Sequence, residues 1–155
     1  MFIPYSNISD NSKVWIYQSD REISIQEINE INQQLKSFCD QWTSHGKPVK
    51  SSFKLFGWFL CFFVDELTHI TSGCSIDSSV TLIKSIQNQY KIDFFKRTNI
   101  AFLYNNKTRV VSFLEFKKYL HLNILVYNNL VKTKDEFEKN WLIPLKDSWL
   151  NKHMI

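Results

Sequence analysis

Residues 58–65 read WFLCFFVD, and this stretch decides the fold more than any other part of the chain. The apolar run has the length of a strand, and alternate residues of a strand point to opposite faces of a sheet. Trp58, Leu60, Phe62 and Val64 share one face, while the residues between them are also mostly apolar. The sequence therefore predicts a strand that is covered on both sides.

One face of this strand needs a cover that two packed helices alone would not supply. Trp15 and Tyr17, on a predicted strand nearer the N-terminus, also share one face. We expect the C-terminal segment to supply the second cover through Trp141 and Trp149. A dimer partner is the alternative.

The chain around the central strand alternates strand patterns with helix patterns. Residues 13–19 are rich in β-branched and aromatic side chains, and residues 52–56 and 58–65 meet near Gly57 as a hairpin. A capping box at Ser24–Glu27 opens a helix whose apolar residues recur every three or four positions as far as Trp42. A second helix is predicted over 80–90, with Asp77 as its N-cap.

The remaining third of the chain continues the alternation. Residues 99–104 and 108–111 form a predicted strand pair that turns at Asn105-Asn106. Capping patterns at Ser112 and Thr133 begin further helices. The order β-α-β-β-α-β with extra C-terminal helices predicts a single α+β domain over 1–155, with the ferredoxin-like sandwich topology.

Composition restricts the class of protein. The chain has 155 residues and no apolar run near the length of a membrane helix or a secretory signal, so we expect a cytoplasmic protein without membrane insertion. Three well-separated cysteines, Cys39, Cys61 and Cys74, argue against a disulfide framework. No Cys-x-x-Cys or paired histidine spacing is present, so neither a metal site nor a cofactor is expected.

Four strings of the sequence are informative when they are taken together. They are VWIYQ (14–18), QWTSHGKP (41–48), residues 72–80 and YNNLV (127–131). Over nearly the whole chain they resemble a family of small Bacteroidetes proteins often described as ABC transporter ATPases. The resemblance implies no established activity, and it carries no catalytic residue over to any position here.

A nucleotide-binding P-loop is excluded by the glycine content. The motif needs Gly-x-x-x-x-Gly-Lys-Ser/Thr, because backbone N–H groups wrap the phosphates and a hydroxyl reaches magnesium. Around Gly46-Lys47, Gln41 stands in place of the first glycine and Pro48 in place of the hydroxyl residue. The chain therefore does not have the site of an ABC-type ATPase.

The stretch 71–79, TSGCSIDSS, is the strongest candidate for a site in the sequence. Small polar residues between a strand and a helix leave hydroxyls and backbone N–H groups near a helix start, where anions bind. Lys47 is placed to close over a bound phosphate or carboxylate. The candidate anion-binding residues are Ser72, Gly73, Ser75, Ser78, Ser79 and Lys47.

Cys74 is the candidate for catalysis or redox chemistry in the same stretch. The positive end of the following helix would favour its thiolate. His69 or His45 is the candidate base, and Asp65 or Asp77 is the candidate acid that orients the base. The alternative is that Cys74 was selected for packing in a tight turn while Asp77 and Ser78 cap the helix. We regard this structural role as the stronger interpretation.

The charge is distributed unevenly along the chain. Residues 1–77 hold six basic and nine acidic side chains, and residues 78–155 hold thirteen and six. The basic half could contact phosphate backbones, with Trp15 and Tyr17 as stacking platforms, but the glycine-containing core of an RNA-recognition strand is absent. The uneven charge also fits lysines on a solvated surface.

The sequence therefore favours a non-catalytic binding protein for a partner protein or a small anion, as a monomer or a homodimer. A cysteine-dependent enzyme and an RNA-associated protein are the two alternatives.

Overall fold

Strand β5 (Phe59–Asp65) is the middle strand of a three-stranded antiparallel sheet in the computed structural model, which describes residues 1–67 and 70–154. It lies between β1 (Lys13–Gln18) and β4 (Lys50–Phe56), and a turn at Gly57 joins it to β4. All side chains from Phe59 to Val64 are buried. The prediction of a central strand covered on both sides is confirmed.

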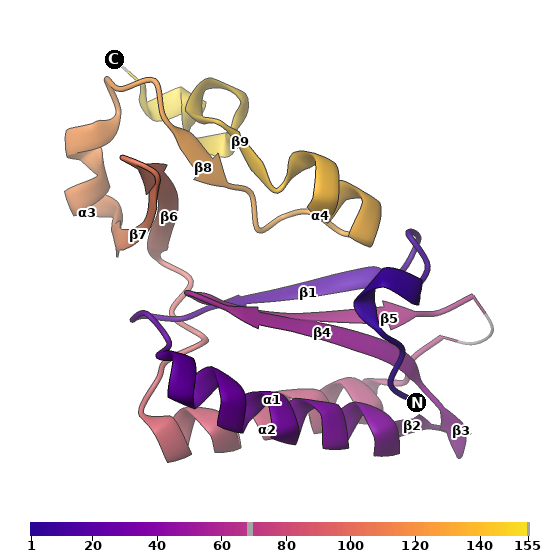
Figure 1. Ribbon diagram of the computed structural model, residues 1–155. Coiled ribbons are helices and arrows are strands. Elements are labelled where there is room, and N and C mark those ends of the chain that lie inside the picture. The colour runs from indigo at the N-terminus through magenta and orange to yellow at the C-terminus, as the bar shows by residue number, and fades with distance from the viewer. Residues whose placement is uncertain (68–69, 155) are drawn as a thin grey trace.

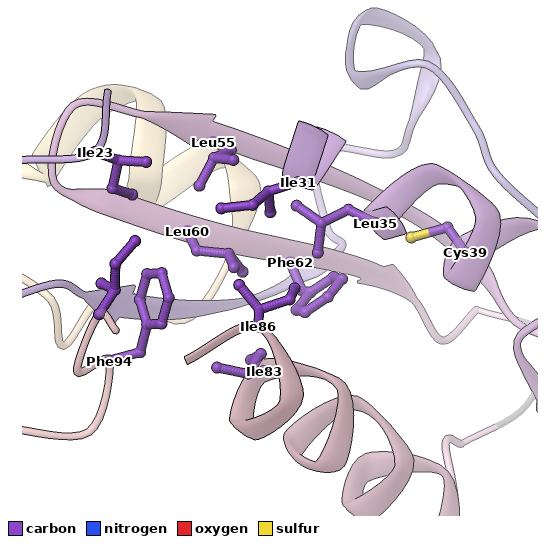
Figure 2. Packing of buried hydrophobic residues seen from close by; sticks show 11 residues of the cluster. Ile23, Ile31, Leu35, Cys39, Leu55, Leu60, Phe62, Ile83, Ile86 and Phe94 are labelled. Carbon is purple, nitrogen blue, oxygen red and sulfur yellow. The ribbon is translucent and has the colours of Figure 1, made fainter. Parts of the chain in front are cut away.

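Two helices cover one face of this sheet (Figure 1). Helix α1 (Ile25–Gln41) starts at the predicted capping box, and α2 (Gly73–Tyr90) lies beside it. Figure 2 shows side chains from both helices turned toward the sheet, where they pack against Leu60 and Phe62. The helical members of this cluster are Ile31, Leu35, Cys39, Ile83 and Ile86.

The C-terminal half of the chain covers the opposite face (Figure 1). It forms a second antiparallel sheet in the order β7 (Lys107–Ser112), β6 (Asn99–Tyr104), β8 (Leu125–Tyr127) and β9 (Leu142–Pro144). Helix α4 (Lys134–Asn140) precedes β9.

Trp141 is the aromatic anchor of this cover. It is buried in one cluster with Phe59, Phe63 and Phe137, as the sequence predicted. The prediction for Trp149 is wrong, because its side chain is 50% exposed and stacks on Phe113 instead. The C-terminal half of the same chain therefore covers the second face of the first sheet, and of the two expected tryptophans only Trp141 packs against β5.

The remaining elements are short. They are the hairpin β2 (Thr43–Ser44) and β3 (Lys47–Pro48), helix α3 (Phe113–Phe116), and 3-10 turns η1 (Tyr5–Asn7), η2 (Lys117–Tyr119), η3 (Leu145–Asp147) and η4 (Trp149–His153). No helix in the described ranges is both long and apolar enough to cross a membrane.

The α+β class is confirmed, but a ferredoxin-like topology is not. The first five major elements follow the predicted order β-α-β-β-α, and the first sheet has the strand order β1-β5-β4. The next strand, β6, pairs with β7 and β8 in the second sheet rather than with β1. Within residues 1–67 and 70–154, β1 therefore has β5 as its only named strand partner.

The predicted N-cap of the second helix is also wrong. Helix α2 begins at Gly73, and Ser72 caps it by accepting a hydrogen bond from the N–H of Ser75. Asp77 lies inside the helix. The small polar residues of this stretch have lower helix propensity and favour caps and turns, but tertiary contacts of the hydroxyls stabilise the extra turn.

Candidate functional site

The hydroxyls of the 71–79 stretch are used inside the fold. The N–H of Ser72 donates to Ser44 Oγ at 2.9 Å, and Ser75 Oγ donates to the carbonyl of Thr43 at 2.7 Å. Ser79 is fully buried and its hydroxyl donates to a carbonyl in its own helix. These bonds fasten the start of α2 to strand β2, so Ser72, Ser75 and Ser79 have a structural use.

The other proposed anion ligands lie on the surface. Gly73 and Ser78 are exposed, and the Ser78 hydroxyl donates to the carbonyl of Cys74 at 3.0 Å. Lys47 is exposed on β3, which pairs with β2. The structure thus brings the hairpin to the start of the helix, but no polar contact joins Lys47 to the stretch 71–79 in the described part of the chain.

Cys74 is exposed in the first turn of α2. His45 lies in the β2–β3 turn, where its φ of 52° is left-handed, and Asp77 is exposed one turn further along α2. His69, the other candidate base, lies outside the described residues. In the described ranges no hydrogen bond joins Cys74 to a histidine or an acid, so no assembled catalytic group supports the enzyme alternative.

We expect an alkylating reagent at mildly alkaline pH to modify Cys74 alone in the folded protein. Cys39 and Cys61 are fully buried, and burial raises the pKa of the Cys39 thiol to about 11 and also raises that of Cys61. Both therefore stay protonated and shielded. Intact-mass spectrometry should show one adduct in buffer and, since the chain has three cysteines, three in guanidinium. A second rapid adduct under native conditions would contradict the placement of these thiols.

A cleft runs along β1, between the first sheet and the C-terminal half. Its volume is about 560 Å³. Residues 14–18 of β1 line one side, and the connection from α2 to β6, the strands β6 and β8, and the turn η4 line the rest. We call this hollow the β1 cleft.

The polar groups of the β1 cleft are basic or neutral. Lys96 and Arg97 line it and are exposed, and no aspartate or glutamate lies among the lining residues. Neither cation forms an ion pair with another described residue. Burial raises the pKa of the Tyr17 hydroxyl, and the nearby positive charge of Arg97 opposes part of that rise. The charged side chains that line the cleft are therefore both positive, which favours an anionic ligand.

A chain of side-chain hydrogen bonds lies at one end of the β1 cleft. Gln18 Nε2 donates to the carbonyl of Asn99 at 3.1 Å, and Asn129 Nδ2 donates to Gln18 Oε1 at 2.9 Å. The indole N–H of Trp141 donates to Asn129 Oδ1 at 2.9 Å. At the other end, the N–H of Val14 donates to the carbonyl of Lys132 at 3.0 Å.

Sequence analysis missed the β1 cleft as a site. In the sequence, Lys96 and Arg97 stand out only as members of the basic half of the chain. Gln18 and Asn129 lie in two of the strings that carry the family resemblance, but the resemblance assigns no chemistry to them. These residues come together because β6 leaves the first sheet, which local patterns do not reveal.

The aromatic residues considered for RNA stacking are not available as platforms. Trp15 and Tyr17 are partly buried against the helical cluster, where Trp15 packs on Trp42 and Tyr17 on Phe95. A separate surface groove of about 570 Å³ lies over β7. It is lined by Trp58, Tyr104, Asn105, Lys107, Thr108, Arg109, Val110 and Val111.

Neither a metal site nor a similar protein points to a function for this chain. In the described ranges, no group of three or more His, Cys, Asp or Glu side chains is placed to hold a metal ion. Comparison of the chain with known protein families, curated proteins and solved structures finds no match. The arrangement of the described residues is therefore the basis for the function proposed below.

Proposed function

We propose that this protein is a non-catalytic binding protein that holds an acidic segment of a partner in the β1 cleft. The observation that carries the proposal is the pair Lys96 and Arg97, two cations that form no ion pair with any described residue and that line a cleft with no aspartate or glutamate among its lining residues. This retains the binding role expected from the sequence but moves the site from the stretch 71–79 to β1.

Three further features support a ligand of this kind. The volume of about 560 Å³ lies in the range of pockets that hold small ligands. Tyr17, Phe94 and Trp149 line the cleft, so part of its wall is aromatic. The side chain of Trp149 stacks on Phe113 and meets His153 edge-on, and it is still 50% exposed, so its open surface can contact a ligand.

The proposal is tested by selecting peptides from a displayed random library on the immobilised protein. We expect the selected peptides to be enriched in aspartate and glutamate, because a positive cleft favours anionic partners. The double variant Lys96→Glu/Arg97→Glu should weaken binding of a resynthesised peptide by about tenfold or more, measured by fluorescence anisotropy. Both side chains are exposed, so the variant should keep the wild-type melting temperature.

Lys117→Glu/Lys118→Glu is the matched control, since it makes the same change of charge at a different pair of exposed basic residues. It should leave the peptide affinity nearly unchanged. Equal losses in both variants, or selected peptides without acidic residues, would contradict the proposal. Binding of a short oligouridine that is lost on Lys107→Glu/Arg109→Glu would instead favour the RNA alternative, at the groove over β7.

A further inference from the structure

Strand β1 presents a free edge to the β1 cleft. In an antiparallel pair, the N–H and C=O of successive residues point alternately toward the partner strand and away from it. The N–H of Val14 bonds to Lys132, on the side away from β5, and that of Ser19 bonds to Trp58, in the turn before β5. Val14, Ile16 and Gln18 therefore direct their backbone groups into the cleft.

The backbone groups of this edge have no strand partner in the described ranges. The N–H of Val14 is used in the bond to Lys132. Among the described residues, four other outward groups have no backbone partner: the C=O of Val14, the N–H and C=O of Ile16, and the N–H of Gln18. Segment 128–134 flanks this edge: the N–H of Lys134 donates to the carbonyl of Ser12, and Asn129 Nδ2 donates to the side chain of Gln18. Among the described residues, however, its backbone does not pair with Ile16 or with the backbone of Gln18. Four adjacent backbone groups thus form the hydrogen-bonding pattern that one more strand would complete.

The edge itself carries no side chain that blocks pairing. Edge strands are commonly blocked by charged side chains, proline or a bulge, or are covered by a loop. Between Lys13 and Gln18, the strand consists only of Val14, Trp15, Ile16 and Tyr17. Strand β6 does not extend the first sheet beside β1, because it joins the second sheet.

We propose that the occupant is an extended segment of a partner protein, carrying aspartate or glutamate, that adds to β1 as a further strand. Backbone hydrogen bonds to Ile16 and Gln18 give the affinity of strand addition, and Lys96 and Arg97 select acidic side chains beside the strand. This inference rests on the proposed function, because it concerns the same cleft, and it specifies how the acidic segment is held.

The test uses an acidic peptide from the selection above and amide hydrogen exchange of the whole protein, followed by NMR. On saturation with peptide, the exchange of the Ile16 and Gln18 amides should slow by about tenfold or more. The amides of Trp15 and Tyr17, which already point toward β5, should change little. Two peptides are methylated at alternate backbone nitrogens, one at the odd positions and one at the even positions. Only one of the two should lose binding, since only one set of peptide amides faces β1.

The variant Ile16→Pro removes one outward N–H without removing a bond between β1 and β5. It should abolish peptide binding, while Ile16→Val keeps the donor and the affinity. If Ile16→Pro does not fold, the exchange and methylation results still decide the matter. Unchanged Ile16 exchange, with binding that still depends on Lys96 and Arg97, would overturn strand addition and leave the proposed function intact. Failure of any acidic peptide to bind would overturn both.

Discussion

Replacing Trp141 with alanine is expected to destabilise the protein by about 3–5 kcal/mol, the range for truncating a large buried aromatic side chain. Its rings lie 4.6 to 4.7 Å, centre to centre, from those of Phe59, Tyr127 and Phe137. Its indole N–H also donates to Asn129, which would lose this partner. Both the cavity and the unpaired amide oxygen lower the free energy of unfolding.

Urea unfolding followed by circular dichroism measures this change, and Trp149→Ala is the matched control. Trp149 is 50% exposed, so its truncation should cost less than about 1 kcal/mol. Because Trp141 joins the two halves of the chain, we expect a single transition at lower urea in Trp141→Ala. Similar losses in the two variants would show that the cover of β5 does not depend on Trp141.

Replacing Lys134 with methionine is expected to destabilise the protein by about 2–4 kcal/mol. The side chain is 5% exposed, and its ammonium donates to the carbonyls of Tyr5 and Ile8 at 3.0 and 2.9 Å. It also lies 4.7 Å from the centre of the Tyr5 ring. Methionine keeps most of the volume, but it leaves both carbonyls without a donor, and each orphaned buried group costs about 1–3 kcal/mol.

The loss of stability should be largest in the N-terminal segment, whose carbonyls at Tyr5 and Ile8 accept hydrogen bonds from Lys134. Hydrogen exchange should quicken first in residues 5–12, and urea unfolding gives the total change. Lys139→Met, on an exposed part of the same helix, should leave both measurements unchanged. A wild-type unfolding curve for Lys134→Met would mean that water satisfies the two carbonyls equally well.

Local sequence patterns were sufficient to predict several elements of the fold. The capping box at Ser24 and Glu27 forms as predicted, because a helix start is determined by hydrogen bonds over four residues. The turn at Asn105-Asn106 has positive φ at both residues, as the strand pair β6–β7 requires. The continuous apolar run in 58–65 identified a strand buried on both faces.

Other elements depended on contacts that are distant in sequence. The first turn of α2 was missed because Ser72 and Ser75 bond to Ser44 and Thr43, about thirty residues away. Strand β9 is only three residues long, and it exists because it pairs with β8. Patterns within a short window contain neither interaction.

By itself, the sequence determined the α+β class, the central strand and most helix starts, because these follow from the periodicity of apolar residues and from local capping. Only the tertiary structure decided that β6 leaves the first sheet and that Trp141, rather than Trp149, is buried. The β1 cleft results from that departure. Which strands pair depends on packing among segments far apart in the chain, so the site beside Lys96 and Arg97 could not be found from local patterns.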